Sequence, residues 1–512
     1  MSSDRTGSAP QLGEPATERS VPLAMDAAAF RRAGHRLVDL LADLLASVPN
    51  RPVTRGETPA AVRDALGLGG PLPEHGTAVE PLLEETARKL FDHSLFNGHP
   101  RFFGYITSSP APIGMLGDLL ASALNPNVGG WTLGPAATEV ERQTVQWIAE
   151  LIGYPAGTGG LLVSGGNMAN LVCFWAARAA RAPWNVREQG GVRPGDGRLR
   201  AYASAETHTW IQKAADLSGL GTESLRWIPT DGEQRMDVAA LERAIAADRA
   251  AGDRPFLVVG TGGSVSTGAI DPLPAIAALC KERELWFHVD GAYGGLAAAV
   301  DDCPADLRGL ALADSVAVDP HKWLYAPIEA GCALVRDPEK LSGAFSYRPL
   351  YYHFEDSTLN YVDYGPQNTR GFRALKVWLA LRQAGAAGYR RMIGDDIRLS
   401  RALADAVAAS PELELMTQAL SITTFRFVPR DLRGRVAEPA VLDYLNTLNQ
   451  RLLEVIQGGG EVFVSNAVLD GRYVLRACIV NFNTQLADVQ AVPGIAVRLG
   501  RELDAQMRPQ GL

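Results

Sequence analysis

The middle of the chain alternates short apolar runs with helical stretches, and this alternation restricts the possible folds more than any other feature of the sequence. Strands that alternate with helices and are apolar on both faces form a mostly parallel sheet that helices cover. We therefore predict an α/β fold with a large sheet. The predicted strands are 161–163, 199–203, 256–259, 285–289, 315–318 and 333–335, and the predicted helices lie near 167–180, 210–218, 238–250 and 273–283.

The charge and the cysteines of the chain exclude several classes of protein. The 512 residues include 49 Lys and Arg against 57 Asp and Glu, and the net charge of −8 comes without the basic patch that binds nucleic acid. The five cysteines are dispersed and form no Cys-x-x-Cys pair, which argues against a disulfide framework or a zinc site. Because we find neither an apolar run of roughly 18 residues nor a signal peptide, we expect a soluble, cytoplasmic protein without membrane or metal binding.

Different patterns flank the central region. Residues 1–20 are rich in Ser, Gly, Pro, Thr and Glu, so we predict a disordered tail. A helical period runs from Phe30 to Val48, which fits a helix packed either on its own core or on a partner subunit. After about residue 375 a smaller α+β domain is predicted. Its helices lie near 372–386, 440–455 and 488–504, and its strands at 421–428 and 473–481.

The first candidate for a ligand site is the sequence Ser-Gly-Gly-Asn, which follows the predicted strand at 161–163. Backbone N–H groups at the start of a helix form an anion site that suits phosphate. The signal is weak by itself, since many turns between a strand and a helix contain two glycines. It is neither the Gly-x-Gly-x-x-Gly fingerprint of nicotinamide enzymes nor a phosphate loop with its lysine.

Three further residues follow predicted strands. Asp290, in His-Val-Asp-Gly-Ala-Tyr-Gly-Gly, is either a helix cap or ion-pair partner, or a carboxylate that holds a protonated ring nitrogen. Lys322, in Asp-Pro-His-Lys-Trp, is a lysine in an apolar setting and fits a Schiff-base lysine. His208 is either structural or stacked on a planar ring. Since ligands bind at the carboxyl ends of parallel strands, the four segments together predict pyridoxal 5′-phosphate (PLP).

These segments resemble the group II PLP-dependent amino acid decarboxylases, of which the aromatic-L-amino-acid decarboxylases are best known. The resemblance extends from about residue 99 to 481 and includes His-Pro-Arg-Phe-Phe-Gly-Tyr at 99–105 and Arg-Gly-Phe-Arg-Ala-Leu-Lys at 370–376. It implies a fold-type I PLP enzyme with a seven-stranded sheet, and a homodimer with active sites at the interface. After the tail at 1–20, it further implies an N-terminal helical dimerisation segment at 21–115, a large PLP-binding domain at 116–385 and a small C-terminal domain at 386–512.

The resemblance also implies the role of each site residue. Lys322 carries the cofactor as a Schiff base, Asp290 keeps the ring nitrogen protonated, and His208 stacks on the ring. The phosphate is bound by Gly166, Asn167, Ser264 and His321, Ala292 packs under the ring, and the substrate is contacted by Tyr105, Gly129, Trp131 and Thr369.

For the proton donor and the substrate, the sequence leaves more than one choice. In this family a tyrosine on a loop, here about 346–369, returns a proton to the substrate carbon. Counting back from Phe372 selects Tyr361, whereas a small gap would select Tyr364. The remaining tyrosines of the loop are Tyr347, Tyr351 and Tyr352. The two glycines before Trp131 enlarge the substrate pocket, while Thr369 makes it smaller, so the choice of substrate stays open.

We therefore predict decarboxylation of an aromatic L-amino acid (tryptophan, tyrosine, phenylalanine or DOPA) through Schiff-base and quinonoid intermediates. The alternatives are an aldehyde synthase, a decarboxylase of a non-aromatic amino acid and a catalytically inactive paralogue. Relatives with phenylalanine in place of the loop tyrosine tend to be aldehyde synthases, so Tyr361 favours plain decarboxylation. The presence of Lys322, Asp290 and His208 argues against the inactive paralogue.

Overall fold

The computed structural model describes residues 21–193, 195–348 and 358–512, so the predicted tail lies outside the described residues. Contacts within the chain define two compact units. The smaller contains the described residues up to 51 together with 57–94, and the larger contains 52–56 and 95–512. In the described part of the chain, no helix is long and apolar enough to cross a membrane.

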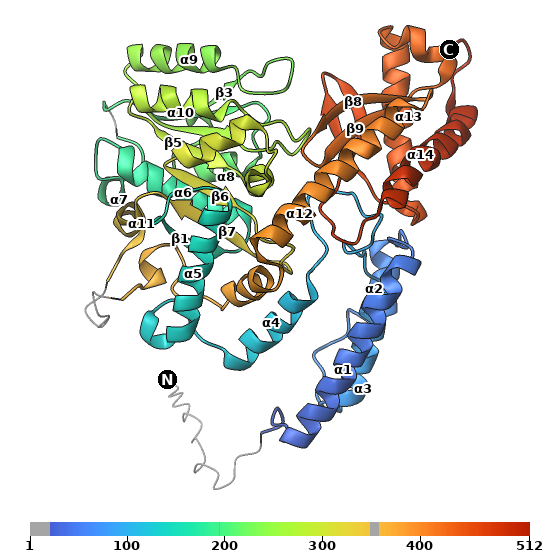
Figure 1. Cartoon of the computed structure of the whole chain (residues 1–512), viewed down its shortest axis with the longest axis horizontal. Helices are drawn as coiled ribbons and strands as arrows, with labels where there is room; N and C mark the ends of the chain where they lie inside the picture. The colour runs from blue at the N-terminus through green and yellow to red at the C-terminus, as the bar shows by residue number, and fades with distance from the viewer. Residues whose placement is uncertain (1–20, 194, 349–357) are drawn as a thin grey trace, which may run out of the picture. The chain divides into compact units, whose positions relative to one another are not determined.

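The smaller unit is helical. It consists of α1 (Ala27–Ser47), η1 (Val48–Asn50), α2 (Pro59–Leu66) and α3 (Val79–Asp92). Helix α1 begins at Asp26, whose side chain accepts a hydrogen bond from the backbone N–H of Ala29. Ion pairs from Arg32 to Glu80 and from Arg36 to Glu84 join α1 to α3, and the two helices lie side by side in Figure 1. The helix predicted from Phe30 to Val48 is therefore present.

A seven-stranded sheet forms the centre of the larger unit (Figure 1). Its strand order is β1-β7-β6-β5-β4-β2-β3. Strand β7 is antiparallel to both neighbours, and the other pairs are parallel. This confirms the predicted α/β fold. The strands are β1 (Gly159–Val163), β2 (Leu199–Ser204), β3 (Leu225–Ile228), β4 (Arg254–Thr261), β5 (Trp286–Asp290), β6 (Ser315–Val318) and β7 (Gly331–Val335).

Helices pack on this sheet, and α6 lies across its middle strands. The helices of this region are α4 (Pro112–Leu124), α5 (Pro135–Leu151), α6 (Gly166–Arg181), α7 (Val186–Gln189), α8 (Trp210–Leu217), α9 (Val238–Ala250), α10 (Leu273–Glu282) and α11 (Pro338–Phe345). Short 3-10 helices are η2 (Trp131–Leu133), η3 (Thr222–Ser224), η4 (Gly294–Ala299), η5 (Ala305–Leu312) and η6 (Tyr361–Asp363).

The C-terminal part contains a four-stranded antiparallel sheet in the order β10-β11-β9-β8, with its own apolar core. Helix α12 (Ala374–Ala408) runs from the large sheet to this small one and is interrupted at Gly385, where φ is 64°. This interruption lies at the predicted boundary of 385/386, and the division into a large and a small domain stays a prediction. The remaining elements are β8 (Leu413–Ala419), β9 (Ile422–Phe427), η7 (Arg430–Arg435), α13 (Pro439–Gly459), β10 (Ser465–Leu469), β11 (Arg472–Cys478) and α14 (Leu486–Met507).

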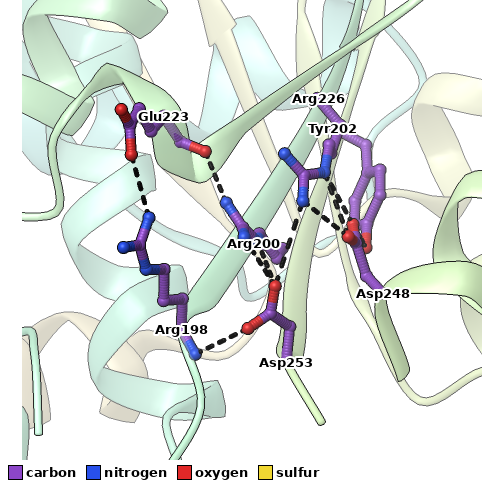
Figure 2. Close-up of polar contacts among 7 residues, drawn as sticks. All are labelled: Arg198, Arg200, Tyr202, Glu223, Arg226, Asp248 and Asp253. Carbon is purple, nitrogen blue, oxygen red and sulfur yellow. Dashed lines mark hydrogen bonds and ion pairs between the residues drawn. The ribbon is translucent and has the colours of Figure 1, made fainter. Parts of the chain in front are cut away.

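A network of charged side chains joins β2, β3 and β4 near the start of these strands (Figure 2). Asp253 contacts Arg200 at 2.6 Å and Arg226 at 3.9 Å, and Asp248 accepts hydrogen bonds from Arg226 and from the Tyr202 hydroxyl. The Arg200 side chain is 8% exposed, so its charge depends on these partners rather than on water. The network ties the edge strand β3 to the rest of the sheet.

Replacing Asp253 by alanine should therefore destabilise the protein by about 2–3 kcal/mol, because the buried Arg200 guanidinium would lose its carboxylate. Denaturant unfolding of the variant and the wild type measures this difference. The matched control is Glu223→Ala, which removes an 85% exposed carboxylate from Arg198 in the same network and should cost less than about 0.5 kcal/mol. Equal losses for the two variants would contradict the structural role of Asp253.

Candidate active site

A cavity of about 490 Å³ lies where strands β1, β2, β5 and β6 end, and eight of the predicted site residues line it. Gly166 and Asn167 follow β1, His208 follows β2, Asp290 ends β5, and Lys322 follows β6. Three further predicted residues, Tyr105, Ala292 and His321, also line this cavity. The carboxyl edge of the sheet thus brings together residues that lie up to 156 positions apart, counted from Gly166 to Lys322.

Neutral donors hold the Asp290 carboxylate in place. The indole N–H of Trp210, on α8, donates to Oδ2 at 2.7 Å, and the backbone N–H of Ala292 donates to Oδ1 at 3.1 Å. Both Asp290 and Trp210 are buried. Because the recorded partners are uncharged, the carboxylate can still form a charge-assisted hydrogen bond with a cationic group in the cavity.

His288 lies behind this pair and is fully buried. Its Nε2 atom donates to Oδ1 of Asn170 at 2.7 Å, and its Nδ1 atom accepts from the Ser315 hydroxyl at 2.9 Å. Burial holds the pKa of His288 below its usual value, so the imidazole is neutral. Its ring meets the Trp210 indole edge-on, at 5.7 Å between centroids, and so supports the tryptophan that holds Asp290. Sequence reasoning missed Trp210 and Asn170.

Lys322 extends into the cavity from the loop after β6. Its Nζ atom lies 3.1 Å from Oδ2 of Asp319, and the lysine side chain is 16% exposed. Trp323, the next residue, stacks on Tyr293 with ring centroids 4.8 Å apart. The lysine is therefore backed by buried aromatic rings, while its amine faces the cavity.

His208 reaches the same cavity from the loop between β2 and α8. Burial lowers its pKa below the usual value for histidine, with the Lys322 charge acting in the same direction and Asp290 in the opposite one. A neutral imidazole that lines the cavity can stack on a flat ring bound there.

The start of α6 fits a phosphate group. The N–H groups in the first turn of a helix have no acceptor inside the helix. A side chain on Gly166 would meet Oδ2 of Asp319 at 2.6 Å and Cβ of Ala292 at 2.9 Å, so only glycine leaves this approach open. His321 lines the cavity and donates from Nδ1 to the Ala330 carbonyl at 2.8 Å. Ser264 is buried and bonds Thr267, while its neighbours Gly263 and Val265 line the cavity. The residues present thus fit PLP.

Besides Ser264, four predicted residues do not line this cavity, and three of them, Tyr361, Gly129 and Trp131, lie together elsewhere. Tyr361 is fully buried, with its ring 4.5 Å from the Arg370 guanidinium, and no partner of its hydroxyl is found among the described residues. The Gly129 carbonyl accepts from the Val362 N–H, and the Trp131 N–H donates to Asn360. Thr369 is exposed just before Arg370.

The other two tyrosines of the loop that the structure describes do not line the cavity either. Tyr364 is half-buried against Tyr361. Tyr347 lies under the Arg187 guanidinium, and Tyr351 and Tyr352 lie outside the described residues.

Asp396 is a fully buried carboxylate of α12 that supports the loop carrying Lys322. Its Oδ2 atom accepts from the Trp323 indole at 3.0 Å and from the Tyr325 hydroxyl at 2.8 Å. Burial raises the pKa of Asp396 to about 7. Sequence reasoning could not find this residue, because it lies 73 positions from Trp323.

The raised pKa of Asp396 predicts a pH-dependent stability. Between about pH 4 and pH 7 the folded chain keeps a proton that the unfolded chain has lost, so this carboxyl makes unfolding easier as the pH rises. The Asp396→Asn variant should therefore gain stability relative to the wild type by a few kcal/mol across this range and then level off. Denaturant titrations at several pH values measure the difference. The control is Asp405→Asn, at an exposed position on the same helix, for which the difference in unfolding free energy from the wild type should not change with pH. A difference that is independent of pH for Asp396→Asn would contradict the prediction.

Comparison with known proteins agrees with this geometry. The pyridoxal-dependent decarboxylase conserved domain matches residues 67–428. The chain belongs to the pyridoxal-dependent decarboxylase family. It is therefore a PLP-dependent amino acid decarboxylase, as the sequence motifs predicted.

Among its relatives is an aromatic-L-amino-acid decarboxylase from Bacillus atrophaeus, which is 32% identical over 467 residues that cover 90% of this chain and 93% of the relative. The structure of TDC from Oryza sativa with PLP and tryptamine is 28% identical, with a TM-score of 0.86, and the match covers 95% of this chain and 100% of that one. Tryptophan decarboxylase from Catharanthus roseus, in complex with L-tryptophan, is 26% identical with a TM-score of 0.83, over 94% and 99% of the two chains.

Proposed function

We propose that this decarboxylase acts on an aromatic L-amino acid and releases the corresponding amine and CO2. The observation that carries the catalytic part is the convergence of Lys322, Asp290, His208 and the start of α6 on one cavity. The aromatic substrate is supported by the relatives, since one is an aromatic-L-amino-acid decarboxylase and one was solved with tryptamine.

Each residue has a defined part in this proposal. The Lys322 amine, which lines the cavity, would hold the cofactor through its aldehyde. When bound, PLP supplies the electron sink that stabilises the carbanion left when CO2 departs. Asp290 would hold a proton on the ring nitrogen, and His208 and Ala292, which line the same cavity, would contact the ring. Gly166, Asn167, Ser264 and His321 form the phosphate site, as the resemblance implies.

We further propose that two copies of the chain form a homodimer that completes each site. Helix α4 exposes four leucines in helical register, Leu116, Leu119, Leu120 and Leu124, each 49–62% accessible. Gly129, Trp131, Thr369 and Tyr361, predicted to contact substrate or return the proton, lie away from the Lys322 cavity. A second copy that covers α4 and brings this cluster to the neighbouring cavity accounts for both observations. Leu119→Glu should then reduce the dimer fraction in light scattering and activity together.

Incubation of the purified chain and PLP with the twenty amino acids, DOPA and 5-hydroxytryptophan, with products identified by mass, tests the substrate. We expect an amine and CO2 from at least one aromatic amino acid. Stoichiometric hydrogen peroxide and ammonia would instead show an aldehyde synthase. If Tyr361 returns the proton, Tyr361→Phe should raise that side reaction and Tyr364→Phe should not.

A second candidate substrate class is favoured by Arg476, which lines the cavity and is 2% exposed. Its Nη1 atom donates to the Tyr105 carbonyl and to Ser465, whereas Nε and Nη2 have no partner among the described residues. A guanidinium with free donors can bind a carboxylate. An acidic amino acid as the preferred substrate, with a KM that rises strongly in Arg476→Met, would replace the aromatic proposal.

We also propose a cytoplasmic location. All five cysteines are unpaired, and four of them are buried, which suits a reducing compartment. Fractionation of the producing cells tests this proposal.

A further inference from the structure

Asp319 places a carboxylate at the phosphate site of this enzyme. Its side chain is 3% exposed, and Oδ2 lies 3.1 Å from Nζ of Lys322. Oδ1 has no hydrogen-bond partner among the described residues. The Nδ1 atom of His321 lies 3.7 Å from Oδ1 and already donates to the Ala330 carbonyl. One oxygen of a buried carboxylate is therefore left without a proton donor, which is costly.

The same carboxylate faces the start of α6. A Cβ atom built on Gly166 would lie 2.6 Å from Oδ2, and one built on Gly165 would lie 4.0 Å from Oδ1. The free N–H groups and the positive end of the dipole at a helix start favour an anion nearby. Asp319 thus lies beside two features that attract negative charge, the Lys322 amine and the first turn of α6.

Those two features are also the ones that the proposed function assigns to the cofactor. The first turn of α6 would bind its phosphate, and Lys322 would bind its aldehyde. A phosphate ester carries a charge of about −1.5 to −2 near neutral pH, and like charges this close repel each other strongly when they are screened from water.

We propose that Asp319 is an internal anion that competes with the cofactor phosphate for the start of α6 and thereby sets how tightly the chain holds PLP. The inference rests on the proposed function of this site. Asp319 is a positioning and affinity-determining residue here, because it acts on the phosphate site rather than on the reacting carbon. In the neutral variant Asp319→Asn, the cofactor phosphate should bind at the start of α6 without a competing anion.

Pyridoxal, which lacks the phosphate, separates this role from an effect on Lys322. The apo form of the full-length chain is titrated with PLP and with pyridoxal, and binding is followed by visible absorbance and by tryptophan fluorescence. We expect Asp319→Asn to lower the Kd for PLP at least tenfold and to change the Kd for pyridoxal less than threefold. Inorganic phosphate should also compete with PLP at lower concentration in the variant than in the wild type.

Asp319→Ala is the second neutral variant and should show the same selective gain, which keeps the test valid if one variant folds poorly. Asp302→Asn, at a 75% exposed carboxylate, is the control and should change neither Kd. An equal gain for PLP and pyridoxal would show that Asp319 acts on Lys322 alone and would overturn the proposal, as would unchanged or weaker PLP binding in both neutral variants. Failure of the proposed function is distinct, since the wild-type chain would then release no CO2.

Discussion

Replacing Lys322 by alanine should reduce decarboxylation by at least about 10³-fold and should abolish the covalent retention of PLP. Lys322 is the lysine whose amine faces the cavity at the end of β6, and a lost nucleophile cannot be replaced by its neighbours. Release of CO2 from the substrate measures the first effect. Visible absorbance of the protein after gel filtration measures the second.

The matched control is Lys340→Ala, at a lysine whose side chain is 47% exposed and pairs with Asp337. This variant should keep both the absorbance and the activity of the wild type. An Lys322→Ala protein that still retains the cofactor covalently would show that another amine holds it, and the assignment of the site would be wrong.

The Glu141→Gln variant should lose about 3–5 kcal/mol of stability, because it breaks a buried ion pair from one side. The side chains of Glu141 and Arg370 are at most 1% exposed, and Oε1 of Glu141 lies 2.5 Å from Nη2 of Arg370. Oε1 of Glu141 also accepts from the Leu162 N–H of β1. In the variant the Arg370 charge would stay buried without its partner. Denaturant unfolding measures the loss.

Two comparisons separate this effect from a general loss of charge. Glu454→Gln opens the exposed pair with Arg451, whose side chains are 52–54% exposed, and should cost less than about 0.5 kcal/mol. The double variant Glu141→Leu with Arg370→Met removes both charges and should recover much of the stability. A loss below about 1 kcal/mol in Glu141→Gln would contradict the account. Because the Arg370 guanidinium also contacts the Tyr361 ring, the single variant should disturb the cluster around Gly129 as well.

In the large sheet, the sequence predicted the strands that have short apolar runs, and these are all of its strands except the edge strand β3. Strand β3 escaped prediction because it is a four-residue edge strand that contains Arg226 and an exposed Trp227. Strands β8 and β10 escaped because partly exposed residues interrupt their apolar pattern. The helix predicted to end near 386 is interrupted at Gly385, whose backbone is non-helical, and a further helical segment that the sequence did not predict continues to Ala408.

The sequence predicted those site residues whose functional side chains come directly after a predicted strand, such as Asp290 and Lys322. Trp210 and Asn170 were not, because they join the site through contacts 80 and 118 positions away in the chain, and such contacts leave no local pattern. Asp319 belongs to the motif Asp-Pro-His-Lys-Trp, but its effect on the phosphate site can be inferred only from its place beside Gly166 and Lys322 in the structure. Counting along the loop selected Tyr361 without revealing that its ring packs on Arg370.

The most direct test of the central claim is the release of labelled CO2 from carboxyl-labelled aromatic amino acids by the purified full-length chain with PLP. The account predicts CO2 and amine in equal amounts, without hydrogen peroxide, from at least one of tryptophan, tyrosine, phenylalanine and DOPA. It also predicts that this release disappears in Lys322→Ala. No release from any of these substrates, or release that persists in the variant, would contradict the account.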